Sequence, residues 1–344
     1  LKQFEKAIEF YEKAIVLNPD YAKAHYNLAG AYHELDQFDE ALKSYQDSIK
    51  IDSNYAEAHN NLGNLFEELS QLDEAINSYN KALTLNPNYL ESHYSLSLIF
   101  QNLRQFEDMV THLKEVVKIK PDFAEAHNNL GIAFKELTQF NNSVESYRAA
   151  LNINPNYLEA HNNLGNALKE LGLFEDAIES YKRALIIEPD YPTLHNNLGN
   201  ALKEIGQFDD AIKSYKKAIS FNIDNPESHN SLGVIFFERD ELEKAIIAFK
   251  KAIHINPNYE DALNNLGAAY KDLGRIEDAI HSYKKVLSFN PDNHETHNNL
   301  GNIYSDYDRL NDAVICFNNA IEIKPDYAEA HNNLGIVYML LDRL

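Results

Sequence analysis

Histidine recurs every 34 residues along this chain, and this spacing limits the possible fold more than any other feature. Leu263 interrupts the series once, and His297 resumes it in the same register. The histidines of the series are His25, His59, His93, His127, His161, His195, His229, His297 and His331. Proline and glycine follow the same period, and no insertion or deletion shifts it. A fixed period of this size is typical of a solenoid, in which each unit buries its apolar side against its neighbours.

The unit 158–191, with Leu158 as position 1, shows what one repeat encodes. Its first half, LEAHNNLGNALKEL, gathers positions 4, 7, 8 and 11 on one side of a helix and positions 2, 6, 9 and 13 on the other. Gly172 then provides a helix stop, and FEDAIESYKRALII forms a second amphipathic helix. Pro189 ends it, because proline lacks the N–H donor and disfavours helix in the preceding residue. The sequence therefore predicts two short helices per unit.

The residues at fixed positions of this unit resemble the tetratricopeptide repeat. They are Leu164, Gly165, Leu168, Ala177, Tyr181, Ala184 and Pro189. One departure is uniform, because the family usually has tryptophan at position 4, where this chain has histidine and where no tryptophan occurs at all. The resemblance covers the whole chain and implies an all-α, right-handed superhelical solenoid of stacked helix-turn-helix units. It also implies a binding scaffold whose concave face is lined by the first helix of each unit.

The period divides the chain into units of a single solenoid, 1–344. The nine full units are 22–55, 56–89, 90–123, 124–157, 158–191, 192–225, 226–259, 260–293 and 294–327. Residues 1–21 and 328–344 form partial units, which we expect to be pieces of a longer array.

Asparagine occupies position 6 of most units, on the polar side of the first helix. These residues are Asn27, Asn61, Asn129, Asn163, Asn197, Asn265, Asn299 and Asn333. A carboxamide offers one acceptor and two donors, so it can pair with both polar groups of a peptide unit. The pattern predicts a face that binds an extended peptide through its backbone, and it resembles the array of the O-linked N-acetylglucosamine transferase and similar bacterial arrays. The alternative is that these asparagines are soluble fillers or bond neighbouring repeats.

Other residues are candidates for the same face. They are Asn166 and Asn200 at position 9, Lys135, Lys169 and Lys203 at position 12, and Phe237. Phe237 could anchor a ligand or reflect drift of one repeat. Asparagine is also frequent at position 5, which we expect to point toward the neighbouring unit.

The charge of the chain restricts its partners. Acidic residues number 53 against 31 basic ones, which gives a formal net charge of −22. Such a chain repels phosphates and anionic lipids, so nucleic acid and acidic membranes are not expected partners. Glutamates at positions 2 and 13 flank the asparagines, either as a groove that selects neutral or basic peptides or as a solvated face. We expect a cytoplasmic protein, or an extracellular one if it forms fibres.

The sequence offers no catalytic or metal-binding motif. Cys316 is the only cysteine, and no nucleophile–base pair, phosphate-binding loop or CxxC motif is present. Packed helices lie ~8–10 Å apart, whereas two ligands of one zinc ion lie within ~4 Å. Histidines one repeat apart are therefore expected to belong to the core. We predict that this stretch is not an enzyme and binds no cofactor.

Two other functions stay open at this stage. The array could recruit substrates for a transferase domain outside residues 1–344. It could also be structural, because its ends lack polar capping helices and copies could associate end to end.

Overall fold

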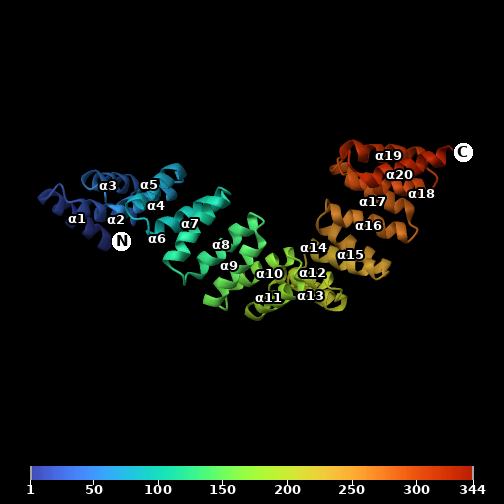
Figure 1. The fold of residues 1–344 in the computed structure, drawn as a ribbon, viewed down its shortest axis with the longest axis horizontal. Coiled ribbons are helices and arrows are strands. Elements are labelled where there is room, and N and C mark those ends of the chain that lie inside the picture. The colour runs from blue at the N-terminus through green and yellow to red at the C-terminus, as the bar shows by residue number, and fades with distance from the viewer. Residues whose placement is uncertain (1, 343–344) are drawn as a thin grey trace. The chain divides into compact units, whose positions relative to one another are not determined.

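The computed structural model describes residues 2–342, which form twenty α-helices and no strand (Figure 1). The chain divides into two compact parts, 1–172 and 173–344. The first part holds α1 (Lys2–Leu17), α2 (Ala22–His33), α3 (Phe38–Ile51), α4 (Ala56–Glu68), α5 (Leu72–Leu85), α6 (Leu90–Asn102), α7 (Phe106–Ile119), α8 (Ala124–Glu136), α9 (Phe140–Ile153) and α10 (Leu158–Glu170). The second part holds α11 (Phe174–Ile187), α12 (Pro192–Glu204), α13 (Phe208–Phe221), α14 (Pro226–Glu238), α15 (Leu242–Ile255), α16 (Glu260–Asp272), α17 (Ile276–Phe289), α18 (His294–Asp306), α19 (Leu310–Ile323) and α20 (Ala328–Leu341).

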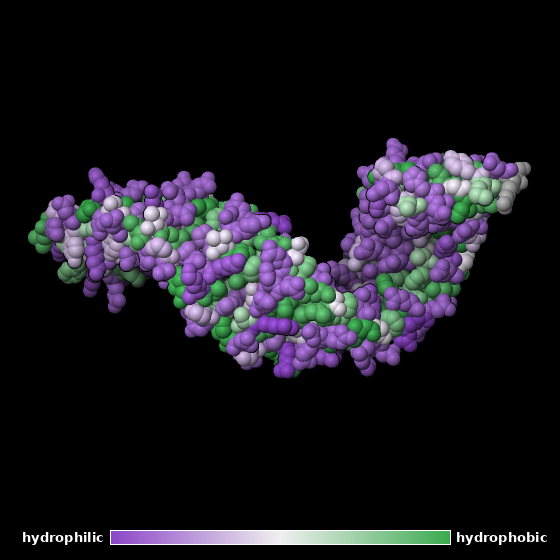
Figure 2. Space-filling view, in the orientation of Figure 1, coloured by the Kyte–Doolittle hydropathy of each residue, from purple (hydrophilic) through white to green (hydrophobic). Residues whose placement is uncertain are grey.

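Each part is a stack of helix pairs, as the periodicity predicts. Helices that follow one another along the chain pack together within each part. The first helices of neighbouring units are also in contact, for example α8 with α10 and α14 with α16. The predicted all-α fold of repeated helix pairs is confirmed. No helix in the described range 2–342 combines the length and apolar character needed to cross a bilayer, and polar residues are interspersed with apolar ones over the face shown in Figure 2.

A left-handed residue at position 15 ends the first helix of most units. Gly172, Gly206 and Gly274 have φ values of 73°, 74° and 75° there. Six units place another residue in the same conformation, namely Asp36, Ser70, Arg104, Thr138, Asp240 and Asp308. Glycine adopts positive φ without a steric penalty, whereas a residue with a Cβ does not. The turn geometry is therefore imposed by the packing of the helix pair and not by glycine alone.

The core is built on an aromatic ring that lies directly over a glycine. In α8 and α9, Tyr147 at position 24 is fully buried, and a Cβ added to Gly131 would lie 2.5 Å from its Cε1 atom. The same arrangement recurs in Gly63, Gly199, Gly233, Gly267 and Gly301 with Tyr79, Tyr215, Phe249, Tyr283 and Phe317. The missing side chain at position 8 is what lets the two helices approach this closely.

The unit 90–123 departs from this pattern without losing its core. Ser97 replaces the glycine, Leu113 the aromatic residue, and Met109 and Val116 the two alanines, and all four are fully buried. The smaller residue at position 24 leaves room that the larger ones at positions 20 and 27 fill. Such a volume-conserving exchange keeps a core intact.

The position-4 histidines fasten each first helix to the loop before it. The ring Nε2 atom pairs with the carbonyl oxygen six residues earlier, at 2.8 Å between His195 and Pro189 and at 3.0 Å between His93 and Pro87. The rings range from buried in His195 to exposed in His331. The expected core position is found for His93, His195 and His229, which are buried, whereas the other rings lie at the edge of the core or, in His331, are exposed.

One histidine of the ladder meets a second histidine. The Nδ1 atoms of His93 and His112 lie 2.9 Å apart, and the His112 ring stacks on Phe100. Burial, with the proximity of His93 adding to it, lowers the pKa of His112 to about 4, although Asp108 opposes the change. Burial also lowers the pKa values of His59, His195 and His229.

We predict that Gly131→Ala destabilises the chain by about 1–3 kcal/mol, because the new methyl group meets Tyr147 in a core without free space. Gly335→Ala is the matched control, since it occupies the same repeat position in α20 and a Cβ there meets nothing within 4 Å. The control should keep or raise stability, by about 0.5–1 kcal/mol. Urea unfolding followed by circular dichroism measures both, and equal effects would refute the close-approach argument.

We predict that the chain loses stability as the pH falls from about 6.5 toward 4. A histidine whose folded pKa is lowered, as in His112, stays neutral when folded while the unfolded chain already binds protons, so acid favours unfolding. The replacement His112→Phe should reduce the difference between the melting temperatures at the two ends of this range. Phe100→Leu is the control, because it removes the stacking partner and keeps the titrating ring. An unchanged pH dependence in His112→Phe would contradict the prediction.

Candidate functional site

The position-6 asparagines are held in place by hydrogen bonds between neighbouring repeats. The Nδ2 atom of Asn163 donates to Oδ1 of Asn128 at 3.2 Å, across 35 residues of sequence. Asn265 donates to Asn230 at 3.1 Å, and Asn333 donates to Asn298 at 3.1 Å. Where position 5 is tyrosine the hydroxyl accepts instead, so Asn61 donates to Tyr26 at 2.9 Å and Asn129 to Tyr94 at 3.4 Å. The inter-repeat bonding that the sequence left open is therefore present in the structure.

The position-5 asparagines are structural. Asn60, Asn128, Asn196, Asn230 and Asn298 are all buried. Several accept a bond from the hydroxyl at position 3 of the next unit, such as Ser92 to Asn60 at 2.8 Å and Ser228 to Asn196 at 3.0 Å. A buried carboxamide without hydrogen-bond partners would destabilise the folded state. At these five residues position 5 points toward the neighbouring unit, as expected, whereas Asn162 and Asn264 are half-buried and Asn332 is exposed.

The position-6 carboxamides keep capacity for a ligand. All eight are half-buried. Asn129, Asn163 and Asn265 each use one N–H donor, and within residues 2–342 their Oδ1 atoms accept no bond. Each of these three therefore offers one free acceptor and one free donor, in an orientation fixed by its neighbour. This is the set of groups needed to pair with a peptide backbone.

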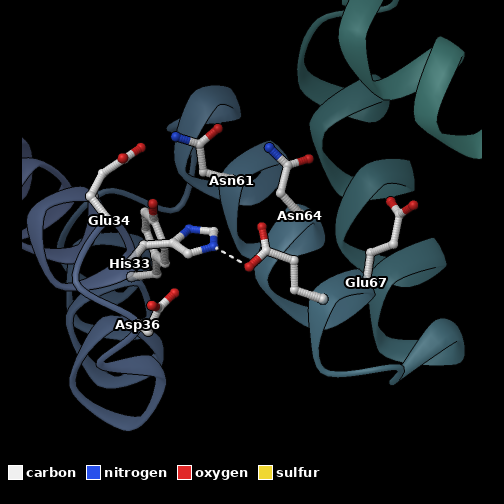
Figure 3. Close-up of a pocket in the computed structure, with 9 residues that line it drawn as sticks. His33, Glu34, Asp36, Asn61, Asn64 and Glu67 are labelled. Carbon is white, nitrogen blue, oxygen red and sulfur yellow. Dashed lines mark ion pairs between the residues drawn. The ribbon is translucent and has the colours of Figure 1, made fainter.

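An acidic cavity adjoins one end of this face in the first part of the chain. It has a volume of about 810 Å³ and lies between the end of α2 and the exposed side of α4 (Figure 3). Its lining residues are Gly30, His33, Glu34, Asp36, Tyr45, Asn61, Asn64, Glu67 and Glu68. Four are carboxylates, and His33 Nε2 lies 3.0 Å from Glu68 Oε2. The surplus of negative charge suits a cationic side chain.

Figure 3 shows how the labelled side chains surround the cavity. His33, Glu34 and Asp36 come from the side of α2, and Asn61, Asn64 and Glu67 face them from α4. Tyr79 anchors the α4 side, because its hydroxyl donates to Asn64 at 2.7 Å and to Glu67 at 3.0 Å. Tyr45 contributes the floor, and burial raises its pKa to about 12, so its hydroxyl stays protonated. The carboxamide of Asn61 thus belongs both to the asparagine series and to the cavity.

Several of the other predicted site residues have partners of their own. Lys135, Lys169 and Lys203 each pair with the glutamate that follows, at 3.2, 3.5 and 3.2 Å. Asn200 accepts a 2.7 Å hydrogen bond from Tyr215, and Asn166 at the same repeat position is half-buried. Asn27, Asn197 and Asn299 are half-buried as well. Phe237 is partly buried and packs against the apolar core of the second part. The lysines therefore neutralise part of the glutamate charge on this face.

Sequence reasoning missed most of the residues that line the cavity. His33, Asp36 and Tyr45 were not among the predicted site residues, although all three line it. Asp36 stands at the turn position, where Asp240 and Asp308 also occur, whereas His33 is the only histidine at position 12. The histidine at position 12 is the local departure from the repeat that could have identified the site. Within residues 2–342 no group of three or more histidine, cysteine or acidic side chains could hold a metal ion.

Comparisons with known proteins agree on the kind of repeat. A family model described as TPR repeat matches residues 1–36, 31–70, 133–172, 168–206, 199–238, 235–274 and 308–342. Models described as tetratricopeptide repeat match 56–89, 260–293, 282–315 and 90–123. No curated protein matches the chain in sequence.

Solved structures show similar folds. The complex of Cut9 and Hcn1 from the APC/C contains a chain with a TM-score of 0.54 and 14% identity, and the match covers 98% of this chain and 93% of that one. PilF of Pseudomonas aeruginosa gives a TM-score of 0.52 at 17% identity, over 61% of this chain and 95% of its own. MamA gives a TM-score of 0.45 at 28% identity, and the match covers 48% of this chain and 90% of MamA. With family models matching well over half of its length, the chain belongs to the tetratricopeptide repeat family.

Proposed function

We propose that this chain is a protein-interaction scaffold that binds extended, neutral or basic segments of partner proteins along its position-6 asparagines. The observation that carries the proposal is the pair of free groups on Asn129, Asn163 and Asn265, each fixed by a bond to the preceding repeat. An extended peptide presents one N–H and one C=O per residue, which these carboxamides can satisfy. Recognition of this kind depends on the backbone and makes little demand on the partner's sequence.

The inter-repeat bonds also support the affinity of such a face. A side chain that is free to rotate must be ordered when a ligand binds, and that ordering costs about 0.5–1.5 kcal/mol for each rotamer-rich group. The bonds from Asn163 to Asn128 and from Asn265 to Asn230 have already restricted these carboxamides. A ligand therefore meets groups that are prearranged, and less of its binding energy is lost.

The charge around the asparagines favours neutral or basic partners. The cavity between α2 and α4 carries Glu34, Asp36, Glu67 and Glu68, and no lysine or arginine is among its lining residues. A lysine or arginine side chain of a bound segment would gain favourable interactions there, whereas an aspartate or glutamate would be repelled. The net charge of −22 acts in the same direction over the whole chain.

We predict that replacing Asn129, Asn163 and Asn197 with alanine weakens peptide binding by about tenfold or more, since each lost hydrogen bond contributes about 1 kcal/mol. The probes are fluorescent unstructured peptides of equal length with positive, zero or negative net charge, and fluorescence anisotropy measures their binding. The probes contain no large apolar residues, so the positive and neutral peptides should bind to the asparagine face of the parent chain, and the negative one should not.

The control must separate binding from stability, because Asn163 also bonds the buried Asn128. Ser92→Ala with Ser228→Ala removes bonds to Asn60 and Asn196 inside the same network and leaves position 6 untouched. This control should melt at a lower temperature yet bind peptide as the parent does. Undiminished binding in the asparagine variant, or equal loss in both variants, would exclude the asparagine face as the binding site.

A further inference from the structure

We propose that a second binding site lies on the opposite side of the repeats, in an apolar groove between α13, α14 and α15 that takes an acidic amphipathic segment of a partner protein. The groove has a volume of about 320 Å³. Helix α14 contributes His229, Leu232 and Phe236 to it, at positions 4, 7 and 11. These positions lie on the side of the first helix away from position 6. The groove is therefore separate from the asparagine face.

The floor of the groove includes an apolar side chain that the fold does not require. Ile247, at position 22 on α15, is 58% exposed. The other full units place a polar or charged residue there, with one exception, Ile315: these residues are Lys43, Asn77, Thr111, Glu145, Glu179, Lys213 and His281. Together with Ile219, Leu232 and Phe236, Ile247 forms a continuous apolar surface open to solvent. An apolar patch of this kind inside a polar rim is typical of an interaction site.

The rim of the groove is positively charged in a strongly acidic chain. Lys216, Lys244 and Lys251 line it, and no carboxylate does. Lys244 pairs with Glu241 and lies 5.7 Å from the centre of the Phe236 ring. Within residues 2–342, Lys216 and Lys251 form no ion pair. Two unpaired ammonium groups beside an apolar floor are complementary to an apolar side chain flanked by aspartate or glutamate.

The size of the groove limits what can enter it. Its volume stands at the lower end of the range of about 300–1,000 Å³ that small-molecule pockets span. One or two side chains of leucine or phenylalanine size fit into such a space, and neighbouring carboxylates would then lie over the lysines. Because the rim is exposed to solvent, its charges should act mainly on the association rate and on the salt dependence of binding.

The chain contains a matched groove position that differs mainly in charge. Ile315 on α19 occupies position 22 and is 59% exposed, almost the same as Ile247. The residues that correspond to Lys244 and Lys251 are Asp312 and Asn319 in that unit, while Lys284 corresponds to Lys216. Asp312 is paired with Arg309 at 2.7 Å. An acidic segment should therefore favour the site at Ile247 over the site at Ile315.

The experiment measures the anisotropy of a fluorescent peptide of alternating leucine and glutamate, titrated with chain 1–344 at low and at high salt. The parent chain should bind this peptide, and salt should weaken the binding. A peptide with glutamine in place of glutamate, and one with serine in place of leucine, should each bind about tenfold more weakly or worse. Equal binding of the glutamine peptide would overturn the proposal.

Variants locate the site. Ile247→Asp should weaken binding about tenfold, because it replaces the apolar contact with a repelling charge, whereas Ile315→Asp should bind as the parent does. Lys216→Glu with Lys251→Glu should also lose binding, and the alanine variant of Asn129, Asn163 and Asn197 should keep it. Circular dichroism confirms that each variant is folded. Equal loss in both isoleucine variants, or loss in the asparagine variant, would refute this location.

A second copy of this chain is the alternative occupant. Light scattering over a range of protein concentrations, without peptide, detects self-association. A dimer that forms in the parent and disappears in Ile247→Asp would assign the groove to a second copy and overturn the proposal. A monomer that binds the acidic peptide in the variant-dependent manner described would support it.

Discussion

The contact between the position-24 ring and the position-8 glycine is the constraint on which the rest of the structure depends. Where it occurs, the ring fills the space that a Cβ would occupy, as Tyr147 does over Gly131, so it sets how closely the two helices of a unit approach. With that approach fixed, the first helix can rotate very little about its own axis. Position 6 must then face the polar side and position 4 the loop before the helix. The histidine bond is compatible with this contact but does not require it, because His93 bonds Pro87 in the unit 90–123, where Leu113 replaces the ring.

The asparagines link the binding face to the stability of the stack. In the proposed function Asn163 would offer its free acceptor to a ligand, while one of its donors bonds the buried Asn128 of the preceding repeat. A substitution at such a position therefore changes both affinity and the coupling between repeats. The coupling also works in the other direction, since a peptide that spans several repeats holds their spacing fixed. The bonds between repeats give a reason why a poor helix former recurs in the middle of a helix.

The sequence predicted the fold well because the signals for the fold recur in every unit. It predicted the site only in part because the residues of the site do not all recur. Helices α10 and α11 begin and end where the periodic apolar residues, Gly172 and Pro189 indicate. Periodicity also gives the direction of a side chain around its helix, but not its burial, which depends on the neighbouring repeat. Position 5 and position 6 are adjacent in sequence, yet Asn128 is buried and Asn129 is half-exposed. The cavity at α2 and α4 depends on His33, which is the only histidine at its position, so no period marked it.

Departures from the repeat fall into two kinds, and only one of them points to function. In the unit 90–123, Leu113 is smaller than the usual ring, and Met109 is larger than the usual alanine, so the changes compensate one another inside a buried core. Ile247 has no such compensation, because it exposes apolar surface and improves no core contact that the other units lack. A solvated position in a repeat is free to carry a polar residue without affecting the fold. An apolar residue there, beside Lys216 and Lys251, is best explained by a partner that covers it.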